Sequence, residues 1–138
     1  MKIIFENTPG PEDLNFFEQK LLEFNRSIIH PYGYEDFIIK HIDESKSIQA
    51  GLHGQTGSGW LYISSLWVHE KFRNQGMGKK LVLLAEDAAI KKDCHGAYLY
   101  TYSFQSPDFY KKLGYEVFGT LENFCDTHTK LYMKKELG

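Results

Sequence analysis

The sequence predicts an α/β fold: a mixed, mostly antiparallel sheet flanked by helices, with one strand–helix–strand unit. Two observations predict it. Short segments rich in β-branched and aromatic residues recur along most of the chain, and segments of helical periodicity separate some of them. A loop with two glycines joins one such strand to the longest predicted helix. We expect the 138 residues to form one domain, 1–138.

Composition excludes several classes of function. The net charge is −2 and the pI is about 6.3, which gives no basis for a nucleic-acid partner. No apolar run approaches the length that spans a membrane, and the acidic N-terminus does not resemble a signal peptide. Cys94 and Cys125 are far apart in sequence and indicate free thiols in a reducing compartment. We therefore expect a cytoplasmic protein with no membrane partner.

The first third of the chain predicts a short strand and a helix. Residues 2–7 favour a strand, which the breaker cluster at residues 8–11 ends. Asp13 can cap a helix whose apolar residues recur at helical spacing and which fades near residues 27–30. A loop follows at residues 31–34.

The next segment changes to the period of strands. We expect strands over residues 37–42, 48–53 and 60–68, separated by turns at 43–46 and 54–59. Three strands joined by short turns predict an antiparallel meander.

A long helix follows the meander. Its apolar face runs from Gly76 to about Lys92, and a strand is expected over residues 97–102. With the strand at 60–68, these elements form a βαβ unit whose two strands should be parallel neighbours. Ser106 and Pro107 then start a short helix that ends at Gly114. The last strands are predicted over residues 115–120 and 130–134.

The glycine loop carries the clearest chemistry. A helix N-terminus presents unpaired backbone N–H groups and partial positive charge, and Gly76 and Gly78 let an anion approach closely. Arg73, Lys79 and Lys80 add cations, so the loop is typical of a pyrophosphate site. A Walker A loop requires Ser or Thr where Lys80 stands, and a dinucleotide fingerprint requires a third glycine where Leu81 stands.

The segment Arg73-Asn74-Gln75-Gly76-Met77-Gly78 fits Arg/Gln-x-x-Gly-x-Gly/Ala at every position, and Leu66-Trp67-Val68 precedes it at the strand end. The segment Ser106-Pro107-Asp108-Phe109-Tyr110-Lys111-Lys112-Leu113-Gly114-Tyr115 fits Ala/Ser-x-x-Phe-Tyr-x-Lys-x-Gly-Phe/Tyr. With these two motifs the chain resembles the GNAT (GCN5-related N-acetyltransferase) family. The resemblance covers the C-terminal two thirds in detail and implies a GNAT-like fold with acetyl-CoA as co-substrate.

The resemblance also implies site residues. The strand end would diverge from its parallel neighbour and expose backbone groups to the pantetheine, and the loop would hold the pyrophosphate. The cofactor-binding residues would be Leu66, Trp67, Val68, Arg73, Asn74, Gln75, Gly76, Met77, Gly78 and Lys79. Tyr110 would protonate the leaving thiolate as general acid, which a phenol of pKa about 10 can do at neutral pH. We expect Phe109 in the core and Tyr110 facing elsewhere.

The general base stays open. An attacking amine must lose a proton, yet strand 60–68 carries no carboxylate. His128, His69 and Tyr62 are candidates for the base or for the acceptor side, and so are His53, Glu70 and a water relay through Ser64. Residues 32–34 and 124–128 could shape the acceptor pocket. The six histidines show no metal-ligand spacing, so no metal is expected.

The sequence therefore favours an acetyl-CoA-dependent N-acetyltransferase that transfers the acetyl group directly to a primary amine of a small molecule or peptide. No cysteine lies in either motif to carry the acyl group. A non-catalytic acyl-CoA-binding domain is the alternative, and a nucleotide-binding module is a third, weakened by the failed Walker pattern. An exposed sheet edge could pair in a homodimer.

Overall fold

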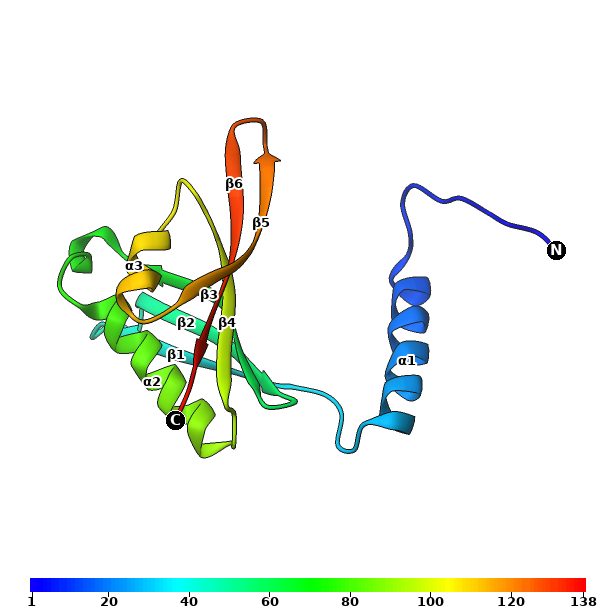
Figure 1. The fold of residues 1–138 in the computed structure, drawn as a ribbon, viewed down its shortest axis with the longest axis horizontal. Helices are drawn as coiled ribbons and strands as arrows, with labels where there is room; N and C mark the ends of the chain where they lie inside the picture. The colour runs from blue at the N-terminus through cyan, green and yellow to red at the C-terminus, as the bar shows by residue number, and fades with distance from the viewer. The chain divides into compact units, whose positions relative to one another are not determined.

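The computed structural model describes residues 1–138 as two compact units, Met1–Gly33 and Tyr34–Gly138 (Figure 1). The first unit contains one helix, α1 (Pro11–Ile28), after ten residues without regular structure. The strand predicted over residues 2–7 is wrong, because no other strand pairs with this segment. The prediction of a single domain over 1–138 stays a prediction.

Helix α1 begins two residues before the predicted cap. Gly10 occupies the N-cap position and Pro11 the first turn, where its fixed φ suits a helix and its missing N–H costs nothing. Asp13 lies inside the first turn, where a carboxylate favours the positive end of the helix dipole. No helix of the structure is long and apolar enough to cross a membrane.

The second unit is a six-stranded sheet with helices, as predicted. Its strands are β1 (Glu35–Ile42), β2 (Ile48–Gly57), β3 (Trp60–Val68), β4 (Gly96–Tyr102), β5 (Glu116–Phe124) and β6 (His128–Glu136). Their order is β1-β2-β3-β4-β6-β5, and only the β3–β4 pair is parallel. The helices are the 3₁₀ turn η1 (Glu70–Phe72), α2 (Met77–Lys91) and α3 (Pro107–Lys112). The antiparallel meander and the βαβ unit are both confirmed.

Strand β2 is longer than predicted, and the turn after it is shorter. The chain reverses at Ser58 and Gly59, both at positive φ, while Gly54 lies inside the strand. A Cβ on Gly54 would come within 2.6 Å of the Phe37 ring on β1. Gly54 thus serves close packing and not a turn, which corrects the predicted turn over 54–59.

The last two strands are also longer than predicted and form a hairpin. Its turn contains Cys125 and Asp126, both at positive φ. Figure 1 shows the hairpin rising beside the loop between β4 and α3. That loop is bound to β6, because the Ser103 N–H donates to the Thr129 carbonyl at 2.8 Å and the Thr129 N–H donates to Ser103 Oγ at 3.0 Å.

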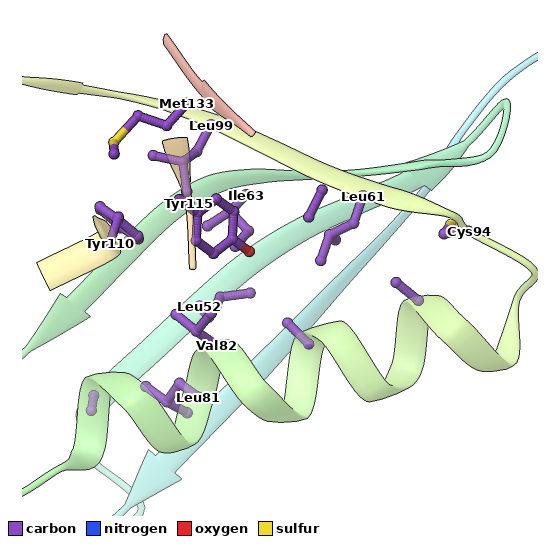
Figure 2. Packing of buried hydrophobic residues seen from close by; sticks show 14 residues of the cluster. Leu52, Leu61, Ile63, Leu81, Val82, Cys94, Leu99, Tyr110, Tyr115 and Met133 are labelled. Atoms are coloured by element: carbon purple, nitrogen blue, oxygen red, sulfur yellow. The ribbon is translucent and has the colours of Figure 1, made fainter. Parts of the chain in front are cut away.

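The core lies between one face of the sheet and the helices α2 and α3. Figure 2 shows α2 crossing this face, with its apolar side chains toward those of the strands. The largest fully buried side chains are Leu61, Leu99, Met133 and Val82. Burial of each such side chain contributes about 1.5–3 kcal/mol, so this face holds the sheet and helices together.

A buried polar network crosses the same core. Glu86 on α2 accepts a hydrogen bond from the Tyr115 hydroxyl at 2.8 Å and one from Lys135 Nζ at 2.9 Å. Burial, and then the adjacent Glu86 carboxylate, raise the pKa of Tyr115 far above its ordinary value. The network ties α2 to the segment after α3 and to β6.

We predict that Glu86→Ala lowers the free energy of unfolding by about 2 kcal/mol, because it leaves the Tyr115 hydroxyl and the Lys135 ammonium unpaired. Urea unfolding followed by circular dichroism measures the change. Asp87→Ala, at the exposed neighbouring position on α2, is the control and should change it by less than about 0.5 kcal/mol. Equal effects of the two variants would contradict the role given to the network.

Candidate active site

The parallel strands β3 and β4 pair only over their first three residues. The ladder joins Trp60 to Gly96, Leu61 to Ala97 and Tyr62 to Tyr98, and no pair follows. On its other edge β3 stays paired with β2 as far as Val68. Residues 63–68 therefore leave the edge that faces β4 without a strand partner. The divergence that the family resemblance implied is confirmed.

A β-bulge accompanies this divergence. The register between β2 and β3 shifts between His53 and Gly54, where Ser64 is the extra residue of β3. A bulge bends its strand and increases the local twist. The bulge thus lies where β3 turns away from β4.

Two cavities open along the diverging strands. The first, of about 660 Å³, lies between the end of β3, the glycine loop, α2 and α3, and is lined by Leu66, Trp67, Val68, Phe72, Arg73, Asn74, Gly76, Met77, Gly78, Lys79, Ser106, Phe109, Lys112 and Leu113. The second, of about 620 Å³, lies between β3, β4 and α3, and is lined by Ile63, Ser64, Ser65, Leu66, Arg73, Tyr100, Thr101, Tyr102, Phe104, Gln105, Ser106, Phe109 and Tyr110. Leu66, Arg73, Ser106 and Phe109 line both, so the cavities adjoin.

The loop before α2 is fixed by its own side chains. Arg73 Nε donates to the Val68 carbonyl at 2.9 Å, and Gln75 Nε2 donates to the Lys71 carbonyl at 2.9 Å. Gly76 is the N-cap of α2 at φ 82°, a left-handed conformation that favours glycine. No side chain caps this helix and no acidic residue lies in its first turn. Its first N–H groups are therefore free to bind an anion.

Gly78 also has a packing role that the sequence did not suggest. A Cβ at this position would lie 3.1 Å from Cζ of Phe109, so the glycine makes room for an aromatic ring of α3. The contact joins the two family motifs directly. Close approach of a phosphate stays a prediction for this residue.

The residues predicted to bind the cofactor lie together. All of them except Gln75 line the first cavity, and Gln75 supports the loop through its bond to Lys71. Phe72 and Lys112, which were not among the predicted cofactor-binding residues, line it as well. Lys80, one of the cations noted in the loop, does not line it.

The prediction for the Phe109–Tyr110 pair needs correction. Tyr110 is 8% exposed and belongs to the core cluster, while Phe109 is half-buried and lines both cavities. Tyr110 packs edge-on against Phe109 and Tyr115, at centroid distances of 5.0 and 5.9 Å. A short helix packed on a sheet buries the side chain that faces the sheet. In α3 that side chain is Tyr110.

Tyr110 nevertheless reaches the second cavity, whose lining includes it. Its hydroxyl is not a buried unpaired atom; the one such side-chain atom is His41 Nδ1. Burial raises the pKa of Tyr110 to about 12, so the hydroxyl keeps its proton at neutral pH. Tyr110 can therefore act as a proton donor to a group in this cavity.

The candidate bases lie in different places. His69 caps η1, accepting the Lys71 N–H at Nδ1 at 3.1 Å, and lines neither cavity. The His128 ring lies 4.8 Å from that of Phe104, which lines the second cavity. The Tyr62 ring lies 4.9 Å from that of Tyr98, on the sheet face opposite α2, and burial raises the pKa of Tyr62.

The structure also gives His53 a partner that the sequence did not indicate. His53 Nε2 lies 2.6 Å from Asp36 Oδ1 on β1, and Gln55 Nε2 donates to the same oxygen at 3.0 Å. These hydrogen bonds, that of Gln55 first, lower the pKa of Asp36. His53 stands opposite Ser65, which lines the second cavity.

Sequence reasoning missed the residues that β4 and its following loop contribute to the second cavity: Tyr100, Thr101, Tyr102, Phe104 and Gln105. A signal was present, because alternation in strand 97–102 places its tyrosines on one face. What it could not show is that this face borders the gap between the two strands.

Comparison with known proteins agrees with this geometry. The sequence model of the acetyltransferase (GNAT) family matches residues 17–115. Acetyltransferase Atu2258 of Agrobacterium fabrum is 30% identical over 135 residues, 98% of each chain. Blasticidin-S acetyltransferase of Streptomyces morookaense is 32% identical over 95 residues, 68% of this chain and 70% of that one. The crystal structure of an acetyltransferase from Bacillus cereus has a TM-score of 0.87 at 28% identity and covers 97% of this chain and 98% of its own.

The fold and the two motifs thus define an acetyl-CoA-dependent enzyme of the N-acetyltransferase class. The chain belongs to the GNAT family of acetyltransferases. These relatives favour an enzyme over a non-catalytic acyl-CoA-binding domain.

We predict that Gly76→Ala lowers the free energy of unfolding by about 1 kcal/mol, because φ there is 82° and alanine disfavours the left-handed region. Nothing lies within 4 Å of the added Cβ, so the cost comes from the backbone alone. Gly119→Ala is a matched control: its Cβ also meets nothing within 4 Å, and its φ is not positive. Urea unfolding measures both variants, and equal stability would contradict the backbone argument.

Proposed function

We propose that the enzyme transfers an acetyl group from acetyl-CoA directly to a primary amine of a small molecule or peptide. One observation carries the proposal: two adjoining cavities meet at the unpaired edge of β3, and Tyr110 lines the second of them. One cavity would hold the coenzyme and the other the acceptor. The reacting atoms would meet where the cavities join.

The first cavity would bind coenzyme A largely through backbone groups of the protein. The uncapped N-terminus of α2, with Lys79 beside it, would bind the pyrophosphate. The backbone groups of Leu66 and Trp67 that face the gap would bind the amides of the pantetheine, while the Val68 carbonyl already accepts a hydrogen bond from Arg73. Unpaired backbone groups are costly when buried, so a ligand that satisfies them gains affinity.

The transfer requires two proton movements. The amine nitrogen attacks the thioester carbonyl, the C–N bond forms, and the C–S bond breaks. The Tyr110 hydroxyl donates its proton to the departing sulfur, and the amine loses a proton to a base. Holding both substrates in adjoining cavities supplies much of the rate, since it makes the attack effectively unimolecular.

We assign the base to the acceptor side of the second cavity. No aspartate or glutamate lines this cavity, so a carboxylate in direct contact with the amine is not available there. Among the predicted bases, His128 is the best-placed candidate, because its ring packs on Phe104 of the cavity wall. His69 is a poorer candidate for the base, since its Nδ1 already accepts a hydrogen bond from a backbone N–H.

We expect acetyl-CoA to bind the purified protein in an isothermal titration with one site per chain. ATP should not compete, because the loop lacks the Walker residues. An absence of heat at millimolar acetyl-CoA would overturn the proposal.

We predict that Tyr110→Phe lowers kcat about 100-fold, with acetyl-CoA affinity changed less than twofold, because the phenol acts only on the departing sulfur. Thiol release measures kcat and calorimetry measures affinity. Tyr98→Phe, on the opposite sheet face, is the control and should retain turnover.

The pH profile gives a second test of the same role. The folded-state pKa of Tyr110 is raised to about 12, so its proton is present below that pH and lost above it. The wild-type rate should rise with pH as the amine deprotonates and show no fall up to about pH 10. A descending limb below pH 10 that disappears in Tyr110→Phe would contradict the raised pKa.

A further inference from the structure

An aromatic cluster forms one wall of the second cavity and extends beyond it. It consists of Tyr100, Tyr102, Phe104, Phe124 and Tyr132. The rings of Tyr102 and Phe104 are stacked, with centroids 5.2 Å apart and planes 3° from parallel. The Phe124 ring lies 5.0 Å from Tyr102, and the Tyr132 ring lies 6.1 Å from Tyr100.

The cluster is formed in advance and is accessible within its unit. Its rings come from β4, the loop after it and the β5–β6 hairpin, which the Ser103–Thr129 hydrogen bonds hold together. Phe104 is 59% exposed and Tyr100 is 38% exposed. Exposed flat rings beside a cavity are typical of a surface that receives a flat apolar group.

A single cation lies within this cluster. Lys130 Nζ is 3.9 Å from the ring centroid of Tyr100, 5.2 Å from that of Tyr132 and 5.8 Å from that of Phe124. None of the ion pairs in the structure involves Lys130. Interaction with the Tyr132 hydroxyl raises the pKa of Lys130, so the ammonium stays charged. The cluster thus holds a positive charge that no carboxylate balances.

The charge restricts what the cluster can bind. The reacting amine must give up its proton, so a cage that stabilises a cation would oppose the reaction. A second cationic group would also be repelled by Lys130. The rings are therefore suited to the non-reacting part of the acceptor, and Lys130 to an anionic substituent on it.

We propose that the aromatic cluster and Lys130 form the acceptor-binding site and select a small amine that carries a flat apolar ring and a carboxylate. The inference rests on the proposed function, since it names the acceptor class for the same transfer. The flat ring packs on Tyr102 and Phe104, the carboxylate contacts Lys130, and the amine points toward Tyr110. A cavity of about 620 Å³ suits a small molecule.

Matched acceptor pairs test the proposal. Phenylalanine against phenethylamine, and para-aminomethylbenzoate against benzylamine, differ only in the carboxylate, while cyclohexylalanine against phenylalanine tests the flat ring. Thiol release from acetyl-CoA should give a kcat/KM at least about tenfold higher for the carboxylate-bearing member of the better pair. Titration of the same amines into the coenzyme A-bound protein gives the preference without turnover.

Three variants test whether Lys130 causes the preference for carboxylate-bearing amines. Lys130→Met should abolish it and raise the acceptor KM about tenfold, while the acetyl-CoA KM stays within twofold. Lys130→Arg should retain it, because the charge remains. Lys134→Met, whose Nζ lies over Phe118 at 5.6 Å outside the cluster, is the matched control and should behave as wild type.

The outcomes are distinct. Equal rates and affinities within every pair, or a preference that survives Lys130→Met, would overturn the inference while leaving the acetyltransferase proposal intact. Activity confined to peptide amines would also overturn it. Failure of acetyl-CoA to bind would instead remove the proposed function itself.

Discussion

The early end of the β3–β4 ladder is the constraint on which the rest of the site depends. Two parallel strands that stop pairing at Tyr62 and Tyr98 leave a row of backbone donors and acceptors without partners. Such groups are costly when buried, so a chain that keeps this gap must satisfy them with a ligand or with solvent. Residues from both faces of the sheet line the second cavity at this gap. Both cavities follow from it.

The two motifs meet across this gap. Arg73 binds the carbonyl at the end of β3 and fixes the loop, and the missing side chain of Gly78 admits the Phe109 ring. The N-terminus of α2 and the aromatic residues of α3 are thereby held against the same strand end. A change in either motif is transmitted to the other through this contact, because the packed interior does not deform freely.

Two buried tyrosines, Tyr110 and Tyr115, have different roles because their hydroxyl groups have different surroundings. Burial raises the pKa of both Tyr110 and Tyr115. The Tyr115 hydroxyl donates a hydrogen bond to Glu86, which also binds Lys135, so this network joins α2, the segment after α3 and β6. Tyr110, five residues earlier on α3, lines the second cavity, and its hydroxyl is not among the buried atoms without a hydrogen-bond partner. The two tyrosines thus differ in the hydrogen-bond partner of the hydroxyl and not in their degree of burial.

The sequence by itself determined the fold class, the bounds of β3 and most of the residues of the first cavity, because local periodicity and contiguous motifs carry that information. It could not assign Gly54, which reads as a turn residue but serves the packing of Phe37 from another strand. Nor could it show that Tyr110 is more buried than Phe109, or that Tyr102 and Lys130 share one surface. Those facts depend on which strands become neighbours in space. Only the tertiary structure, through the order β3-β4-β6-β5, brought them together.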